Sequence, residues 1–97
     1  MRDGNINDFL NSITYQDTAV LFHGKRYCFN PINPSERQNF YCWDIYIWSG
    51  KDNEEGIPVI TILGNSVAEC MQKFLSTPLW DGKTFWQAEQ EMTWVDW

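Results

Sequence analysis

Residues 40–48 constrain the fold of this chain more than any other segment. They read Phe-Tyr-Cys-Trp-Asp-Ile-Tyr-Ile-Trp, and aromatic and β-branched residues of this kind favour the pleated surface of a strand. Because both faces of such a strand would be largely apolar, the segment is predicted to lie in the interior of a sheet. Side chains alternate between the two faces, which gives Tyr41, Trp43, Ile45 and Ile47 on one and Phe40, Cys42, Asp44, Tyr46 and Trp48 on the other.

Two further segments have the pattern of strands. Residues 18–29 read as a hairpin, in which Gly24 supplies the positive φ that a tight turn requires. Residues 57–63 form the next apolar run, and Pro58 near its start cannot donate to a ladder, which favours an edge position. Residues 30–35 contain two prolines and are predicted to be a loop.

Three segments have helical spacing of their apolar residues, and each begins with a residue suited to capping free amide groups. A short aromatic tail, residues 93–97, follows the last of them. The predicted helices are residues 5–13 with Asn5 or Asn7 as the cap, residues 66–75 with the pair Ser66 and Glu69, and residues 84–92 with the pair Thr84 and Gln87.

The order of these elements predicts the fold class. Consecutive strands joined by short loops favour antiparallel pairing. We therefore expect residues 1–97 to form a single α+β domain. It would hold an antiparallel sheet of three to four strands, with one N-terminal helix and two C-terminal helices packed on one face. Whether residues 57–63 pair with residues 40–48 stays open, although the loop between them is short enough for a hairpin.

Charge narrows the classes of partner. The net charge is −6, with most of the excess acid in the second half of the chain. An acidic surface repels phosphate backbones and anionic lipids, so we expect neither nucleic acid nor membrane partners. Residues 25–29 interleave basic and aromatic residues as base-stacking sheets do, but the motif is incomplete. The N-terminus has no apolar signal segment and the three cysteines form no disulfide framework, which predicts a cytoplasmic protein.

Catalytic and metal-binding chemistry has little support in the sequence. The single histidine, His23, lies in the predicted hairpin turn, where such a side chain is usually solvated. Cys28 and Cys42 lie on neighbouring predicted strands, but free thiols of this kind usually pack as small apolar residues. No nucleophile elbow or phosphate-binding loop is present. We therefore predict no catalytic residue, no metal site and no cofactor, and do not expect an enzyme.

The surplus of aromatic residues is the strongest functional signal. They form 16% of the chain, more than we expect a domain of this size to bury, and Trp and Tyr dominate binding hot spots. The sequence therefore predicts a protein-binding module that uses the second face of the strand at residues 40–48. The predicted partner-binding residues are Phe40, Asp44, Tyr46, Trp48, Glu54, Glu55, Trp94 and Trp97.

Acidic residues would steer a basic partner toward this surface. Small acidic proteins that neutralise a toxic enzyme, as immunity proteins and inhibitors do, share this general character, which is an analogy of class and not of motif. Two alternatives stay open. One is a small-ligand-binding domain or small enzyme with a pocket near Asp44, His23 and a cysteine. The other is a self-associating scaffold protein. The residues assigned to steering are Asp52, Glu54, Glu55, Glu89, Glu91 and Asp96.

Overall fold

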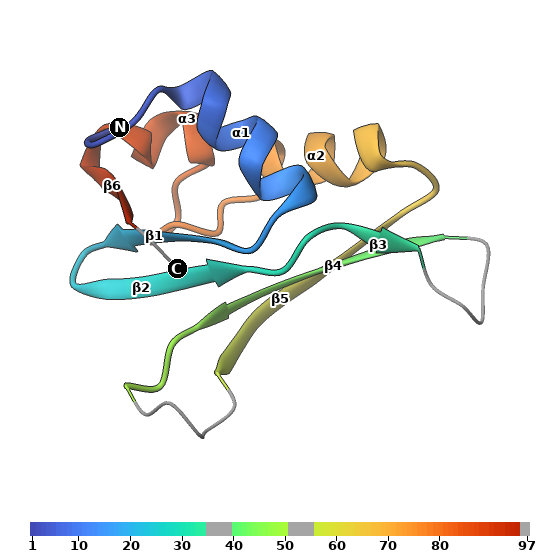
Figure 1. The fold of residues 1–97 in the computed structure, drawn as a ribbon, viewed down its shortest axis with the longest axis horizontal. Helices are drawn as coiled ribbons and strands as arrows, with labels where there is room; N and C mark the ends of the chain where they lie inside the picture. Colours follow the sequence, from blue (N-terminus) through green and yellow to red (C-terminus); the bar gives the residue numbers. More distant parts are fainter. Residues whose placement is uncertain (35–39, 51–55, 96–97) are drawn as a thin grey trace.

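An antiparallel sheet forms one layer of the protein and the helices form the other, which confirms the α+β class (Figure 1). The computed structural model describes residues 1–34, 40–50 and 56–95. The helices are α1 (Ile6–Tyr15), α2 (Val67–Ser76) and α3 (Phe85–Ala88), followed by the 3₁₀ turn η1 (Glu89–Glu91). The strands of the described part are β1 (Thr18–Phe22), β2 (Lys25–Phe29), β3 (Asn33–Pro34), β4 (Tyr41–Ile47), β5 (Ile57–Gly64) and β6 (Met92–Val95).

β4 lies inside the sheet, as its two apolar faces predicted. β5 pairs with one edge of β4 along its whole length, from Tyr41 opposite Gly64 to Ile47 opposite Ile57. The other edge of β4 is shared by β2 and the two-residue β3. β1 pairs with β2 and β6 pairs with β1, so the sheet has the order β6–β1–β2–β4–β5. Among the described strands β5 pairs with β4 alone, and Pro58 near its start fits this edge position.

The β1–β2 hairpin turns through two residues, His23 and Gly24. Phe22 pairs with Lys25 on either side of them. The φ angles of His23 and Gly24 are 49° and 78°, and a type I′ turn requires positive φ at both central residues. Glycine adopts such a conformation without steric cost, whereas a histidine does so less readily. The turn therefore holds the His23 side chain at a defined place at the end of the hairpin.

The helices begin at the polar residues that the sequence indicated. The Asn5 side chain accepts from two amide groups in the first turn of α1. Ser66 Oγ accepts from the backbone amide of Glu69 at 3.1 Å, at the start of α2. Gln87 Oε1 accepts from the backbone amide of Thr84 at 2.9 Å, at the start of α3. These bonds satisfy backbone donors that the first turn of a helix leaves free.

All three α-helices pack on one face of the sheet, as predicted (Figure 1). Phe74 of α2 lies at the centre of this layer. Its ring centroid is 5.0 Å from that of Trp43, 5.9 Å from that of Phe29 and 5.5 Å from that of Phe85. The core cluster comprises Phe9, Ile13, Val20, Phe22, Tyr27, Phe29, Ile32, Trp43, Ile45, Ile62, Cys70, Phe74, Trp80, Phe85, Ala88 and Met92.

Two strands were not expected from the sequence, so the predicted count of three to four is too low. β3 forms inside the predicted loop at residues 30–35, where Asn33 pairs with Cys42 and Pro34 with Tyr41. Two residues are too few for an alternating pattern to be recognised. The rest of β4 had already indicated an interior strand, and such a strand needs neighbours on both edges.

The C-terminal segment departs further from the prediction. The helix expected over residues 84–92 ends after one turn at Ala88, and η1 follows it. Residues 92–95, predicted as a helix end and a tail, form β6 beside β1, with Met92 opposite Phe22 and Trp94 opposite Val20. Pairing with β1 overrides the local helical spacing, because a strand's preference depends on its neighbours in the sheet. Met92 is still buried, as the helical interpretation required, but from a strand.

Removing the Phe74 ring tests this account of the core. We expect Phe74→Ala to lower the free energy of unfolding by about 3–5 kcal/mol, because a fully buried ring leaves a cavity that its neighbours fill only in part. Urea denaturation measures the loss. Tyr15→Ala is the control, since Tyr15 is 68% exposed, and it should change the stability by less than about 0.5 kcal/mol. Equal losses in the two variants would contradict the central place given to Phe74.

Candidate functional site

The second face of the sheet carries no helix among the described residues, and it is the candidate site. Strand pairing places Leu21 beside Arg26, and the Trp48 amide donates to the Arg26 carbonyl at 2.9 Å. Farther along the same face Asp44 lies opposite Thr61. We call this surface the open face and define it by the residues that the strands direct away from the helices and by Trp48. These are Leu21, Arg26, Cys42, Asp44, Tyr46, Trp48, Thr61 and Leu63, whereas Ala19 and Cys28 lie on the same side of the sheet but are buried.

Trp48 and Arg26 form the most distinctive contact of the open face. Trp48 is 41% exposed, and the Arg26 guanidinium carbon lies 5.0 Å from the centre of its ring. A guanidinium over an indole face is held by the negative potential of the ring. The contact therefore fixes two long side chains in one arrangement while leaving much of the ring accessible.

Tyr46 lies beside this pair, opposite Cys28 on β2. Its ring packs against the backbone of Gly56, where a Cβ atom would come within 2.0 Å of a ring carbon. Glycine at this position is thus required by the close approach of Tyr46. Burial raises the pKa of the Tyr46 phenol. Tyr46 is half-buried and held in place, and its location on this face agrees with the sequence prediction.

Asp44 is exposed and accepts a hydrogen bond from Thr61 Oγ1 at 2.7 Å. A carboxylate in the middle of an apolar strand is costly when it is buried without a partner. Here the strand turns Asp44 to the open face, where water and Thr61 both solvate it. Its presence in β4 is therefore compatible with the fold and needs no buried counter-charge.

The structure does not bring all of the predicted partner-binding residues together. Phe40 is half-buried directly before β4. Trp94 lies on the helix-covered face, with its ring 5.5 Å from that of Phe9 and against Gly4, so it does not share the open face with the other predicted residues. Trp80, in the segment before α3, is fully buried. The predicted residues that fall outside the described part of the chain are Glu54, Glu55 and Trp97.

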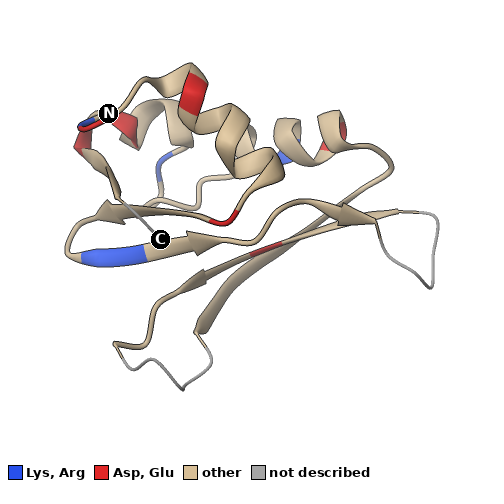
Figure 2. Ribbon diagram, viewed as in Figure 1, with Lys and Arg blue, Asp and Glu red and all other residues tan. Residues whose placement is uncertain are grey.

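The acidic residues that were predicted to steer a partner do not gather around the open face. Glu89 pairs with the Met1 amino group at 2.6 Å, and Glu91 pairs with His23 and Lys83. Both carboxylates are therefore engaged within the molecule. Among the described strands Asp44 is the only acidic residue, whereas the helical layer carries most of the other acidic positions (Figure 2). Asp52 and Asp96 lie outside the described residues.

The structure separates Cys28 from Cys42, the two cysteines that the sequence placed on neighbouring strands. Cys28 lies opposite Tyr46, four residues along β4 from Cys42, a separation of roughly 13 Å at the rise of a strand. Across the ranges that the structure describes, no group of three or more His, Cys, Asp or Glu residues is placed to hold a metal ion. All three cysteines are free thiols, and the two on neighbouring strands do not come close.

The basic and aromatic residues of β2 do not form a stacking platform for bases. Tyr27 and Phe29 point into the core and are buried, while Arg26 alone of this group belongs to the open face. A base-stacking sheet presents its aromatic rings to solvent. The location of these two rings therefore removes the support that the sequence gave to nucleic-acid binding.

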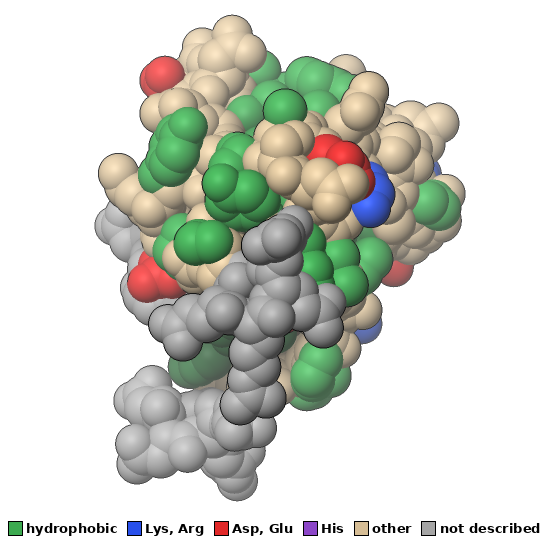
Figure 3. Space-filling model, turned by 90° about the vertical axis from the view of Figure 1, so that its right-hand side faces the viewer, with side chains coloured by type: hydrophobic (Ala, Val, Ile, Leu, Met, Phe, Trp, Pro, Cys, Tyr) green, Lys and Arg blue, Asp and Glu red, His purple; other side chains and the backbone are tan. Residues whose placement is uncertain are grey.

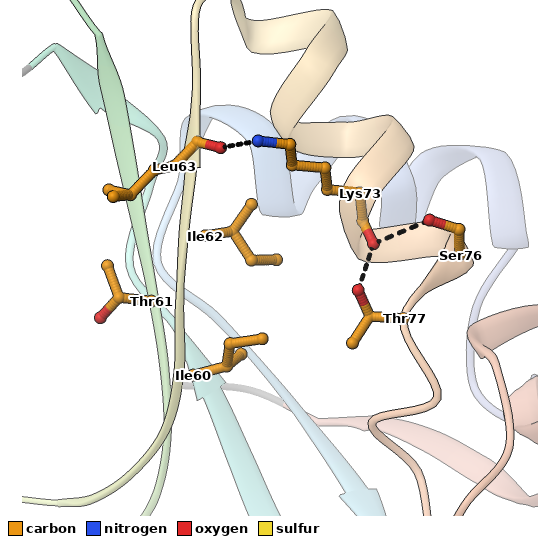
Figure 4. A pocket seen from close by; sticks show the side chains of 7 residues that line it. All are labelled: Ile60, Thr61, Ile62, Leu63, Lys73, Ser76 and Thr77. Carbon is orange, nitrogen blue, oxygen red and sulfur yellow. Dashed lines mark hydrogen bonds between the residues drawn. The ribbon is translucent and has the colours of Figure 1, made fainter.

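A groove of about 340 Å³ runs between the edge of β5 and α2 (Figure 4). Ile60 and Ile62 point into it, and Lys73 closes one end by donating to the Leu63 carbonyl at 2.6 Å. The Ser76 and Thr77 hydroxyl groups donate to the backbone of α2. The volume suits a small ligand, but these polar side chains already have partners within the protein.

Figure 3 shows the end of the molecule, turned a quarter from the view of Figure 1. Apolar side chains are interspersed with polar ones on this face, and charged side chains are few. Asp44 does not line the groove, although its partner Thr61 does. Cys42 is two residues from Asp44 on the same face of β4, but His23 contacts Asp81 and Glu91 instead, so the three groups named for a pocket near Asp44 do not converge.

Sequence reasoning missed a cluster of charged side chains around His23. His23 Nδ1 lies 2.6 Å from Asp81 Oδ2, and His23 Nε2 lies 3.0 Å from Glu91 Oε1. Lys83 Nζ lies 3.3 Å from Glu91 Oε2. His23, Asp81, Lys83 and Glu91 are called the His23 cluster below. The available signal was a pair of two-residue turns, His-Gly and Asp-Gly, but their meeting depends on the tertiary fold.

Comparison of the chain with models of known protein families, with curated proteins and with solved structures finds no match. None of the described helices combines the length and the apolar character that crossing a bilayer requires. The function must therefore be argued from the chemistry of the surfaces described above.

The three cysteines provide a test of which thiols the fold buries. Burial raises the pKa of Cys28 and Cys70, and the thiolate is the reactive form, whereas Cys42 is half-buried. We expect one thiol to react quickly with Ellman's reagent in the folded protein and the other two only after unfolding. Cys42→Ser should abolish the fast phase, and Cys28→Ser should retain it. A fast phase that survives in Cys42→Ser contradicts this arrangement.

Asp44→Asn tests whether Asp44 supports the fold. Thr61 Oγ1 can donate to the amide oxygen as it does to the carboxylate, and the position is exposed. We therefore expect the free energy of unfolding, measured in urea at neutral pH, to change by less than about 0.5 kcal/mol. Thr61→Val, which removes the donor, is the matched comparison. A large loss in Asp44→Asn would show that the carboxylate is structural.

Proposed function

We propose that the protein is a binding module whose open face meets a partner protein of net positive charge. The observation that supports this most is the arrangement of Arg26, Tyr46 and Trp48 as neighbours on that face. Trp, Tyr and Arg are the residue types enriched in binding hot spots, since they offer large contact areas together with polar groups. Among the described residues no helix covers them.

The side chains of this trio are already restricted before a partner binds. Arg26 stacks on Trp48 and Tyr46 packs on Gly56. Ordering a long, flexible side chain at an interface costs about 0.5–1.5 kcal/mol, and contacts within the free protein reduce that cost. Leu21, which is 38% exposed and pairs with Arg26, extends the apolar surface across β1.

Net charge supports a basic partner more than any local ion pair does. The chain has a net charge of −6, yet the described strands contain only Asp44, Lys25 and Arg26 as charged residues. Attraction would therefore come from the field of the whole molecule, which accelerates association and weakens as salt is added. Contacts with the aromatic residues would then determine how long the complex lasts.

Replacing exposed tryptophans by alanine, one at a time, tests the proposal. Trp48→Ala should reduce capture of the partner about thirtyfold or more, because truncating a hot-spot residue costs about 2 kcal/mol or more. Trp86→Ala is the matched control, since Trp86 is 53% exposed on α3, in the helical layer. The measurement is quantitative mass spectrometry of proteins captured from the native host lysate by each tagged variant, at low and at high salt.

The expected result is one basic protein that is retained by the wild type and by Trp86→Ala and lost by Trp48→Ala. Equal capture by the two variants would remove the open face as the binding surface. Recovery of the bait alone would contradict a separate partner, and sedimentation velocity would then show whether the chain associates with itself.

A further inference from the structure

Two tight turns from distant parts of the chain face each other at one end of the sheet. His23 and Gly24 form the turn of the β1–β2 hairpin. Asp81 and Gly82 form a second turn, with φ angles of 53° and 82°, closed by reciprocal backbone hydrogen bonds between Trp80 and Lys83. The first central residue of each turn projects toward the other, and His23 Nδ1 lies 2.6 Å from Asp81 Oδ2.

The geometry determines the protonation state of the ring. His23 contacts a carboxylate with each nitrogen, Asp81 through Nδ1 and Glu91 through Nε2. Ionised carboxylates only accept hydrogen bonds, whereas a neutral imidazole has one donor and one acceptor. Both contacts are satisfied together only when both nitrogens carry a proton. The observed arrangement is therefore that of an imidazolium.

The cluster connects the hairpin to the segment that carries β6. Asp81 and Lys83 precede α3, and Glu91 is the last residue of η1, immediately before β6. The His23 ring also stacks on Phe22, with centroids 3.8 Å apart, and Phe22 pairs with Met92 of β6. Ionic contacts at His23 and backbone pairing between β1 and β6 thus secure the same segment.

We propose that His23 is a protonation-controlled clasp that holds residues 80–95 against the β1–β2 hairpin and loosens its hold when the ring becomes neutral. A neutral ring can keep a donated hydrogen bond to one carboxylate only. The other carboxylate then faces a ring nitrogen that is itself an acceptor. Pairing of β6 with β1 loses its ionic support in that state, and the edge of β1 opens more often.

The direction of the pH dependence follows from the shifts in the pKa of His23 and in the pKa of Glu91. Hydrogen bonds to Glu91 and then to Asp81 raise the pKa of His23 above its ordinary 6.5. This contribution to stability is complete below 6.5 and is lost as the pH rises through the raised pKa. Hydrogen bonds from His23 and then Lys83 lower the pKa of Glu91 below 4.5. The contribution of Glu91 is complete above 4.5 and is lost as the pH falls through the lowered pKa. The clasp is accordingly strongest between the lowered pKa of Glu91 and the raised pKa of His23.

The charged and titratable groups around the clasp come from each neighbouring element. Lys25, at the start of β2, follows the turn, and Tyr27 is buried on the same strand with its pKa raised by burial and then by Asp81. Lys83 pairs with Glu91. Histidine is the side chain whose ordinary pKa lies between pH 5 and 8, so His23 is the group whose titration the proposal concerns.

Nuclear magnetic resonance titration gives the first test, because His23 is the only histidine of the chain. We expect the wild-type ring to titrate above 6.5, and Asp81→Asn and Glu91→Gln each to shift its pKa downward. Both replacements keep the shape of the side chain, and Asn-Gly suits the turn at residues 81–82. A wild-type pKa at or below 6.5, or one that neither replacement lowers, overturns the proposal.

Amide hydrogen exchange gives the second test. It distinguishes a cluster that stabilises the pairing of β6 with β1 from surface ion pairs that leave this pairing unchanged. The Trp94 amide donates to the Arg2 carbonyl and the Met92 amide to the Glu89 carbonyl, so the Thr93 and Val95 amides are the ones that face β1. Corrected for intrinsic rates, protection of the Thr93 and Val95 amides should fall about two- to fivefold between about pH 5.5 and about pH 8.5. His23→Asn keeps a turn sequence that favours type I′ and removes the titrating ring. In this variant the protection of the same amides should be lower than in the wild type at acid pH and should not change with pH. Amides of Ile60 and Ile62, in the β4–β5 pair, are the internal control. Equal pH dependence in the wild type and in His23→Asn overturns the proposal.

Discussion

The packing of aromatic rings between the sheet and α2 is the interaction on which the rest of the structure depends. Phe29 and Trp43 project from adjacent strands, and Phe74 lies over both, with ring centroids 5.9 Å and 5.0 Å away. Phe85 extends the contact to α3. Large rings bury much apolar area per residue, so a short chain acquires an adequate core from few residues. That economy draws all the helices to one face and leaves the other face without one among the described residues.

The same arrangement gives the two surfaces different chemistry. The open face has few charges, and its exposed Trp48 is restrained by Arg26, a combination suited to contact with another molecule. The His23 cluster has exposed charges of both signs and joins segments of the same chain. Exposed ion pairs contribute little individually. Here the value of the cluster lies in its position, because it meets the segment just before β6.

The elements that depend on local pattern were predicted well. The alternation of β4 identified an interior strand and its core-facing residues, and capping residues marked the start of each helix. The open face could be named in part, since Tyr46, Trp48 and Asp44 follow from alternation along one strand. Trp94 could not be placed, because its own surroundings in the sequence do not reveal that β1 pairs with β6. The His23 cluster was beyond prediction for a similar reason, as its members are separated by 58 and 68 residues.

The sequence by itself determined the fold class, the central strand and the residue types available for binding. Periodicity and capping involve residues that are close in the chain, so both can be recognised from the sequence alone. The tertiary structure alone decided the order of the strands, the addition of β6 to the edge of β1 and the meeting of the two turns. These features depend on contacts between distant segments, and the shared core fixes which segments meet. The open face and the His23 cluster are both products of that long-range packing.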